Sequence, residues 1–241
     1  MKRAERQRLK QNDLGELTRQ AQEALAGRTR DLAWVAGVVA AVGAVALGYW
    51  AWQQNVRQGA QKLLADAMVV QEARIGPPAA ATGASGLTFP TERERAQAVL
   101  TKFKAVADAY PSTDEGLYAR YQEGSTQIVL GNPAEAAKAY QVVIDRAGSR
   151  LIGETARLGL AAAHARGGQF DQAITTYKEL AQKKDGGLPI DGILMELGRV
   201  YRDAGRAGEA QQTFNRLIEE FPASPFNADA KRELDALKKP A

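Results

Sequence analysis

The residues that could carry out catalytic chemistry are few in this chain. Its 241 residues include one histidine, His164, and no cysteine, so there is no thiolate nucleophile, no disulfide and no cysteine-ligated metal site. A lone histidine could act as a general base, but His164 falls where a later, similar segment has Tyr201. We therefore expect His164 to be packed and partly buried. These residues favour a protein that is not an enzyme and that has no cofactor, no metal and no small-molecule substrate.

The element that would position these residues is a repeat of 37 residues in the second half of the chain. Such self-similarity is typical of stacked supersecondary units, each too small to bury its own apolar face alone. Three sets of residues keep the 37-residue step: Val99, Ala136, Ala173 and Ala210; Phe103, Tyr140, Tyr177 and Phe214; and Gly131, Gly168 and Gly205.

Each unit is predicted to be an antiparallel helical hairpin. Gly205 can close the first helix because glycine adopts a positive φ at low steric cost. The small residues Gly198 and Ala210 let the two helices approach closely, and Pro222 ends the second helix. Larger side chains are expected to fill the seam between the helices: Leu197, Tyr201, Phe214 and Leu217.

These hairpins resemble the tetratricopeptide repeats. The stretch from Leu194 to Tyr201, followed by Gly205, Ala210, Phe214 and Pro222, is similar to the 34-residue signature of that family. Two earlier units keep the same pattern more loosely. The resemblance implies an all-α fold, a tetratricopeptide-type solenoid of helical hairpins, preceded here by one transmembrane helix.

The chain divides into five predicted segments. A basic cytoplasmic tail covers residues 1–31, a transmembrane helix 32–52, and a helix leading into the array 53–75. A flexible insertion rich in Ala, Gly and Pro covers 76–91 and displaces the first helix of the first hairpin upstream. Tetratricopeptide-like repeats with a C-terminal capping helix cover 92–241.

The transmembrane prediction depends on 21 uncharged residues, Leu32 to Trp52. About 20 apolar residues in a helix span the hydrocarbon core of a bilayer. Trp34 at one end and Tyr49, Trp50 and Trp52 at the other are typical of interfacial anchors. A buried core helix and a cleavable signal peptide are the alternatives, the latter because of the triplet Ala44-Val45-Ala46.

Charge predicts the orientation of this helix. The first 31 residues carry eight basic and five acidic side chains, whereas only Arg57 and Lys62 precede Asp66 on the other side. Positive flanks stay in the cytoplasm, so we expect a single-pass protein of the bacterial inner membrane with periplasmic repeats. The net charge of +4 is mostly in this tail, which leaves the repeats nearly neutral and argues against a nucleic-acid partner.

The resemblance also implies where a partner protein would bind. In the family, the first helices of successive hairpins line a concave groove, and aromatic, Met and Arg side chains supply much of the energy at interfaces. The alternative is that Tyr121, Leu158 and Met195 only pack between hairpins. By the family's register the groove residues are Tyr118, Tyr121, Ser125, Ile128, Leu158, Ala162, Arg166, Met195, Arg199 and Arg202.

Two functions remain open at this point. A short basic tail, one membrane helix and an extracytoplasmic array together resemble the single-pass ancillary subunit of the bacterial SecYEG translocon, a periplasmic chaperone-like protein. This resemblance implies secreted clients and translocon subunits as partners. The alternative is a structural adaptor for envelope assembly or cell-division machinery.

Overall fold

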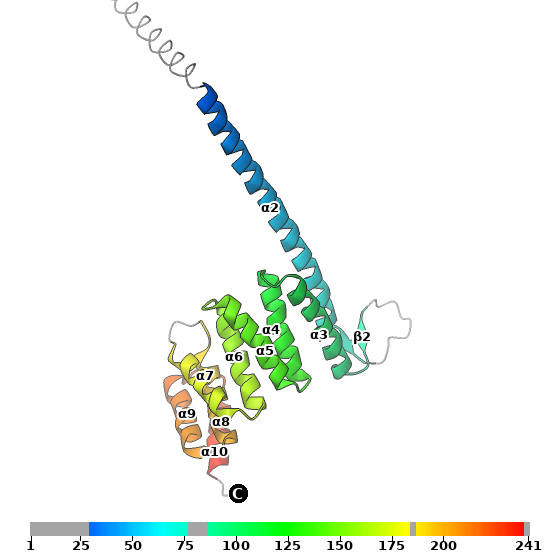
Figure 1. Ribbon diagram of the computed structural model, residues 1–241. Helices are drawn as coiled ribbons and strands as arrows, with labels where there is room; N and C mark the ends of the chain where they lie inside the picture. The colour runs from blue at the N-terminus through cyan, green and yellow to red at the C-terminus, as the bar shows by residue number, and fades with distance from the viewer. Residues whose placement is uncertain (1–28, 77–85, 184–186, 239–241) are drawn as a thin grey trace, which may run out of the picture. The chain divides into compact units, whose positions relative to one another are not determined.

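The computed structural model describes residues 29–76, 86–183 and 187–238 (Figure 1). These residues form nine α-helices and two short strands. The chain divides into two compact units, with the boundary between Val56 and Arg57. Helix α2 (Thr29–Gln71) contributes residues to both units.

In the first unit, the apolar side chains of α2 are exposed. Trp34 is 72% exposed, Val45 73% and Trp50 60%. By length and composition, α2 is the one helix among the described residues that could cross a membrane. Residues 1–28 of the predicted basic tail lie outside the described residues.

The second unit begins with the last turns of α2, followed by two strands that differ from the prediction. The predicted helix ran to residue 75, but α2 ends at Gln71, and β1 (Arg74–Ile75) pairs in parallel with β2 (Thr88–Phe89). Pro77 and Pro78 disfavour helical backbone just before them, which explains an extended conformation at Arg74–Ile75. Residues 77–85 lie outside the described residues, so the flexibility of this insertion stays a prediction.

Helical hairpins make up the rest of this unit, and they follow one another in sequence order (Figure 1). The end of α2 packs on α3 through Leu64, Ala67 and Val70. A final helix, α10, packs against α9 and caps the array with Ala230 and Leu234. The helix bounds are α3 Glu92–Ala109, α4 Asp114–Val129, α5 Pro133–Ala147, α6 Leu151–Arg166, α7 Phe170–Gln182, α8 Ile190–Asp203, α9 Ala207–Glu220 and α10 Asn227–Leu237.

The turn inside each of the last three hairpins has the same geometry. Gly131, Gly168 and Gly205 have φ of 82°, 75° and 74°, the left-handed region that favours glycine. In the last hairpin, the Arg206 N–H donates to the Tyr201 carbonyl at 2.8 Å, and the Gly205 N–H donates to the Arg202 carbonyl at 2.9 Å. This pair of bonds is the Schellman motif, which satisfies the last carbonyl groups of a helix.

Glycine also permits the close approach of the two helices in a hairpin. A Cβ atom added to Gly198 would lie 2.4 Å from the ring of Phe214, and one added to Gly124 would lie 2.8 Å from the ring of Tyr140. The aromatic ring therefore occupies the space that a side chain would need. This confirms the predicted role of Gly198.

Candidate binding face on the first helices of the hairpins

Helix α4 carries four of the predicted groove residues. The Tyr118 ring meets Phe103 edge-on at 6.4 Å, and its hydroxyl accepts a hydrogen bond from the Gln122 amide at 2.6 Å. The Tyr121 ring lies 5.5 Å from Tyr140, whose hydroxyl lies 3.0 Å from Ser125 Oγ. Burial raises the pKa of Tyr140, so this hydroxyl stays protonated at neutral pH. Tyr118, Tyr121 and Ser125 are half-buried, so part of each side chain remains available for contact, whereas Tyr140 is buried.

The predicted residues further along are less uniform. Ile128 and Leu158 are half-buried and pack against the core, whereas Arg166 at the end of α6 is exposed. Ala162 is half-buried and adds little contact area.

Met195 requires a correction. Its side chain is completely buried among the core residues of α7, α8 and α9, so it does not line a surface. The reason is tertiary: the three consecutive residues Ile193, Leu194 and Met195 are all buried, so neighbouring helices enclose α8 on more than one side. Met195 therefore packs in the core, which was the alternative to a groove position.

Arg199 and Arg202 lie on the surface but are already paired. Arg199 Nη1 donates to Glu196 at 2.8 Å, while its Nη2 lies 3.9 Å from Asp229 and its Nε 3.7 Å from Glu233, both on α10. Arg202 donates to Glu233 through Nη1, and its Nε donates to Asp203 at 2.9 Å. The hydrogen bond with Glu233 raises the pKa of the Arg202 guanidinium above its ordinary value. The two arginines therefore hold the capping helix.

His164 is half-buried, as expected from its position in the repeat. Its Nδ1 lies 2.5 Å from Oε1 of Gln169, across the turn between α6 and α7. The histidine therefore stabilises the turn of its own hairpin.

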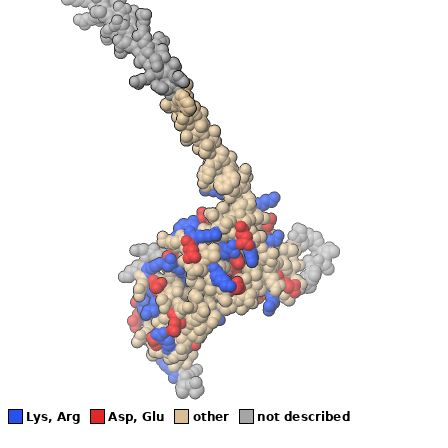
Figure 2. Space-filling model, in the orientation of Figure 1, with Lys and Arg blue, Asp and Glu red and all other residues tan. Residues whose placement is uncertain are grey.

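Charged side chains of both signs are interspersed over the face of the second unit shown in Figure 2. Among the described residues of this unit, many charged side chains are paired with close neighbours, such as Arg120 with Asp108 at 2.5 Å and with Glu123 at 2.6 Å. This face therefore has no large field of one sign, which fits its near-neutral composition.

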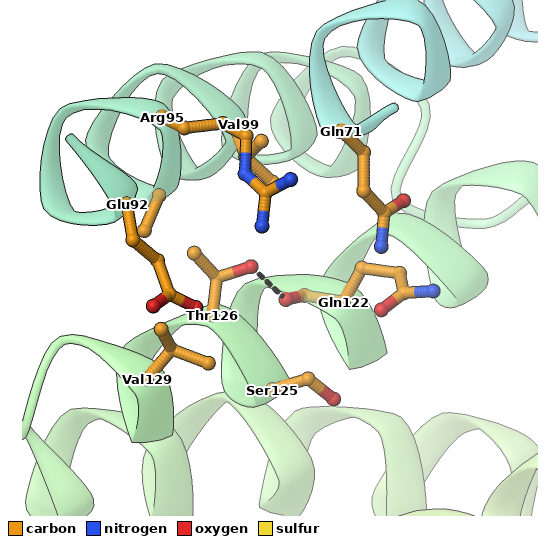
Figure 3. A pocket seen from close by; sticks show the side chains of 9 residues that line it. Gln71, Glu92, Arg95, Val99, Gln122, Ser125, Thr126 and Val129 are labelled. Atoms are coloured by element: carbon orange, nitrogen blue, oxygen red, sulfur yellow. Dashed lines mark hydrogen bonds between the residues drawn. The ribbon is translucent and has the colours of Figure 1, made fainter. Parts of the chain in front are cut away.

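The structure also has a pocket that the sequence pattern did not predict. It lies between the end of α2, the start of α3 and the middle of α4, and has a volume of about 140 Å³ (Figure 3). The 37-residue pattern could have found it if the register had been extended to the displaced first helix, but the insertion at 76–91 interrupts that register. Its lining residues are Gln71, Glu92, Arg95, Ala96, Val99, Gln122, Ser125, Thr126 and Val129.

Arg95 is the most prominent side chain in this pocket. Figure 3 shows its guanidinium group directed into the pocket, with the Gln71 amide directed in from the opposite wall. Arg95 Nη1 donates to the Ala73 carbonyl at 3.3 Å, which holds the side chain in this direction. Glu92, one turn earlier on α3, lines the same pocket near Thr126.

Comparison with solved structures shows the same kind of fold. The crystal structure of a Podosopora anserina protein with nearly identical TPR-like repeats, described as a kinesin light chain, has a TM-score of 0.53 with this chain at 15% identity. The similarity covers 60% of this chain and 78% of that one. A crystal structure of a single-substitution variant of the same protein gives the same TM-score and identity. No curated protein sequence matches this chain.

A protein-family model of the tetratricopeptide repeat-like domain matches residues 30–239, which is most of the chain. Together with the repeated hairpins, glycine turns and close helix contacts, this match confirms the expected solenoid. Folds of this kind generally mediate contacts between proteins and are typically non-catalytic. The chain belongs to the tetratricopeptide repeat-like domain family.

Proposed function

We propose that this protein is anchored in the bacterial inner membrane by α2 and binds polypeptides outside the cytoplasm through its repeats, as a translocon-associated, chaperone-like factor. The observation that carries the proposal is the exposed apolar surface of α2 in the same chain as a hairpin array. Trp34, Val39 and Leu47 are 72%, 66% and 68% exposed. Apolar surface on this scale is stable in lipid and unfavourable in water.

The orientation follows from charge. Eight basic residues precede the apolar stretch, and positive flanks are retained in the cytoplasm. The repeats then lie on the opposite side of the membrane, where secreted polypeptides emerge before they fold.

The α4 surface supports binding of a polypeptide rather than of a nucleic acid. Tyr118 and Tyr121 each present part of a ring that is held in place by a second aromatic ring. A rigid aromatic side chain offers contact area at a low entropic cost, and a near-neutral surface does not select for a strongly charged partner.

A second candidate is a structural adaptor for envelope assembly or cell-division machinery. The pairing of Arg199 and Arg202 with α10 favours it, because this end of the face has little unpaired charge with which to hold varied clients. An adaptor would bind one fixed partner, whereas a chaperone would bind many clients and release them.

The topology can be tested with single cysteines, because the natural chain has none. We expect Ser112→Cys, in the exposed turn between α3 and α4, to react with a membrane-impermeant maleimide in intact spheroplasts. Gln11→Cys should react only after lysis. The reverse pattern would contradict the proposed orientation.

Client binding can be tested with a photo-crosslinking amino acid at Arg166, which is exposed on a first helix. The matched control is Lys178, which is exposed on the second helix of the same hairpin. We expect crosslinks to many newly secreted polypeptides from position 166, which disappear in a chase, and few from position 178. Crosslinks to one stable partner would favour the adaptor, and equal crosslinking at both positions would contradict a binding groove.

A further inference from the structure

We propose that the pocket between α2, α3 and α4 binds the carboxamide side chain of an Asn or Gln residue in a polypeptide held by the repeats. This inference rests on the proposed function, because it names the side chain that such a polypeptide presents. The pocket has room for one side chain, with a volume of about 140 Å³, and is open to solvent along the exposed rim residue Val129.

The charges in the pocket point to a ligand group that both donates and accepts hydrogen bonds. Arg95 is a donor only, with five N–H groups, and the ionised Glu92 is an acceptor only. Among the described residues, Arg95 has one hydrogen bond, to the Ala73 carbonyl, and neither side chain has an ionic partner within 4.0 Å. A carboxamide matches this pair, because its oxygen accepts from Arg95 and its NH₂ group donates to Glu92.

The amide side chains of the other walls support the same ligand. Gln71 extends into the pocket and can both donate and accept (Figure 3). Gln122 also lines the pocket, and its amide is held by donating to the Tyr118 hydroxyl at 2.6 Å. Two neutral amides beside a charge pair of zero net charge favour a neutral polar group.

Other side chains fit less well. A carboxylate would be attracted to Arg95 but repelled by Glu92, and an ammonium group would meet the opposite arrangement. A leucine would displace water from Arg95 and Gln71 without replacing its hydrogen bonds. The buried Ala96 and Val99 form an apolar part of the wall that suits the CH₂ groups of Gln.

The test uses the full chain in lipid nanodiscs and a fluorescein-labelled 13-residue peptide. Its centre carries one guest residue, and its remaining positions alternate Ser and Leu. We expect the Gln guest to bind about five- to tenfold more tightly than the Leu, Glu or Lys guest, as measured by fluorescence anisotropy, since hydrogen bonds to the charged Arg95 and Glu92 side chains in a solvent-open pocket distinguish them.

Charge variants of the pocket should change this preference in a defined direction. Glu92→Gln removes the repulsion between Glu92 and a carboxylate, so the Glu guest should gain about tenfold in affinity. Arg95→Gln removes the repulsion between Arg95 and an ammonium group, so the Lys guest should gain about tenfold in affinity. The matched controls are Glu94→Gln and Arg93→Gln, which change exposed side chains of the same turn that do not line the pocket. They should leave every guest unchanged.

Failure of the inference is distinguishable from failure of the proposed function. Equal affinities for all guests in the natural protein, or no change of preference in the Glu92 and Arg95 variants, would overturn the carboxamide assignment while leaving polypeptide binding intact. Absence of binding by every guest peptide would overturn both.

Discussion

Arginine side chains at the two ends of the array differ in their ion pairing. At the C-terminal end, Arg199 and Arg202 of α8 are held by Glu196, Asp203 and the acidic residues of α10. At the N-terminal end, Arg95 of α3 faces an open pocket (Figure 3). The difference lies in the neighbouring helix, because α10 supplies carboxylates and the end of α2 supplies only Gln71. A capping helix thus pairs, through its carboxylates, the arginines that sequence register alone would assign to binding.

The apolar core is also larger at the C-terminal end of the array than at the N-terminal end. Around α8, a large apolar cluster encloses Met195, Phe214 and Tyr177 from several helices. Around α3, a smaller cluster leaves Val99 at the edge of the pocket. We therefore expect substitutions at the C-terminal end to affect stability, and those at the N-terminal end to affect binding.

The largest expected effect comes from Met195→Ala. This side chain is 0% exposed, so its truncation should leave a cavity and lower the free energy of unfolding by about 2 to 5 kcal/mol. The matched change at the other end is Val129→Ala, which removes a 60% exposed side chain and should cost less than about 0.5 kcal/mol. Guanidinium titration followed by circular dichroism measures both losses of stability. A loss at Met195 as small as that at Val129 would contradict the burial of Met195 in the core.

The next effect is steric. Gly198→Ala places a Cβ atom 2.4 Å from Phe214 in the same core, so we expect a loss of about 1 to 3 kcal/mol. Gly208→Ala is the control, because nothing lies within 4 Å of its added Cβ in α9. The control should be neutral or slightly stabilising in the same titration, since alanine favours helix. Equal stability of the two variants would mean that the helices of this hairpin separate easily.

Alkaline pH should weaken the C-terminal core through Tyr177. Burial raises the pKa of this hydroxyl in the folded state. Its contribution to the free energy of unfolding is therefore complete below the pKa of tyrosine in the unfolded chain, which is near 10, and is lost as the pH rises above that pKa. Between the pKa of the unfolded chain and the higher pKa of the folded chain, titration of Tyr177 should lower the free energy of unfolding by about 1.4 kcal/mol per pH unit. Comparing Tyr177→Phe with the natural protein between pH 9 and 11 isolates the effect, because the phenylalanine variant lacks this titration. Parallel curves for the two proteins would contradict it.

The smallest expected effect concerns the ion pairs that close the C-terminal end. Glu233→Gln removes the charge that Arg199 and Arg202 share, and since both arginines are partly exposed the cost should be about 0.5 to 1 kcal/mol. The variant should also bind the Glu-guest peptide more tightly than the natural protein does, because the arginines become available. Glu135→Gln is the control, since its pair with Lys138 is exposed and should contribute almost nothing.

The sequence pattern predicted much of the hairpin geometry because a repeat encodes local rules. Gly131, Gly168 and Gly205 recur where a helix must end in a left-handed residue, and all three have a positive φ. Gly198 was predicted from the need for close approach, and it faces the ring of Phe214. Each of these rules involves residues of a single hairpin.

The predictions that depend on a neighbouring hairpin were less accurate. Met195 occupies a groove position in the register, but burial by the adjacent helices makes it a core residue. Arg199 and Arg202 are partly exposed, but their pairing with Glu233 could not be predicted from the sequence. The Arg95 pocket was missed because the insertion separates its walls in the chain.

The amino-acid pattern was enough to predict a solenoid of helical hairpins with an apolar segment of membrane-spanning length before it. Spacing of glycine, alanine and aromatic residues is sufficient for that, since each hairpin folds by contacts within about 40 residues. Which predicted groove residues are exposed and unpaired depends on the packing of the folded chain, because the next helix sets both their exposure and their ion pairs. For that reason the fold was predictable from one chain, and the open pocket at Arg95 was not.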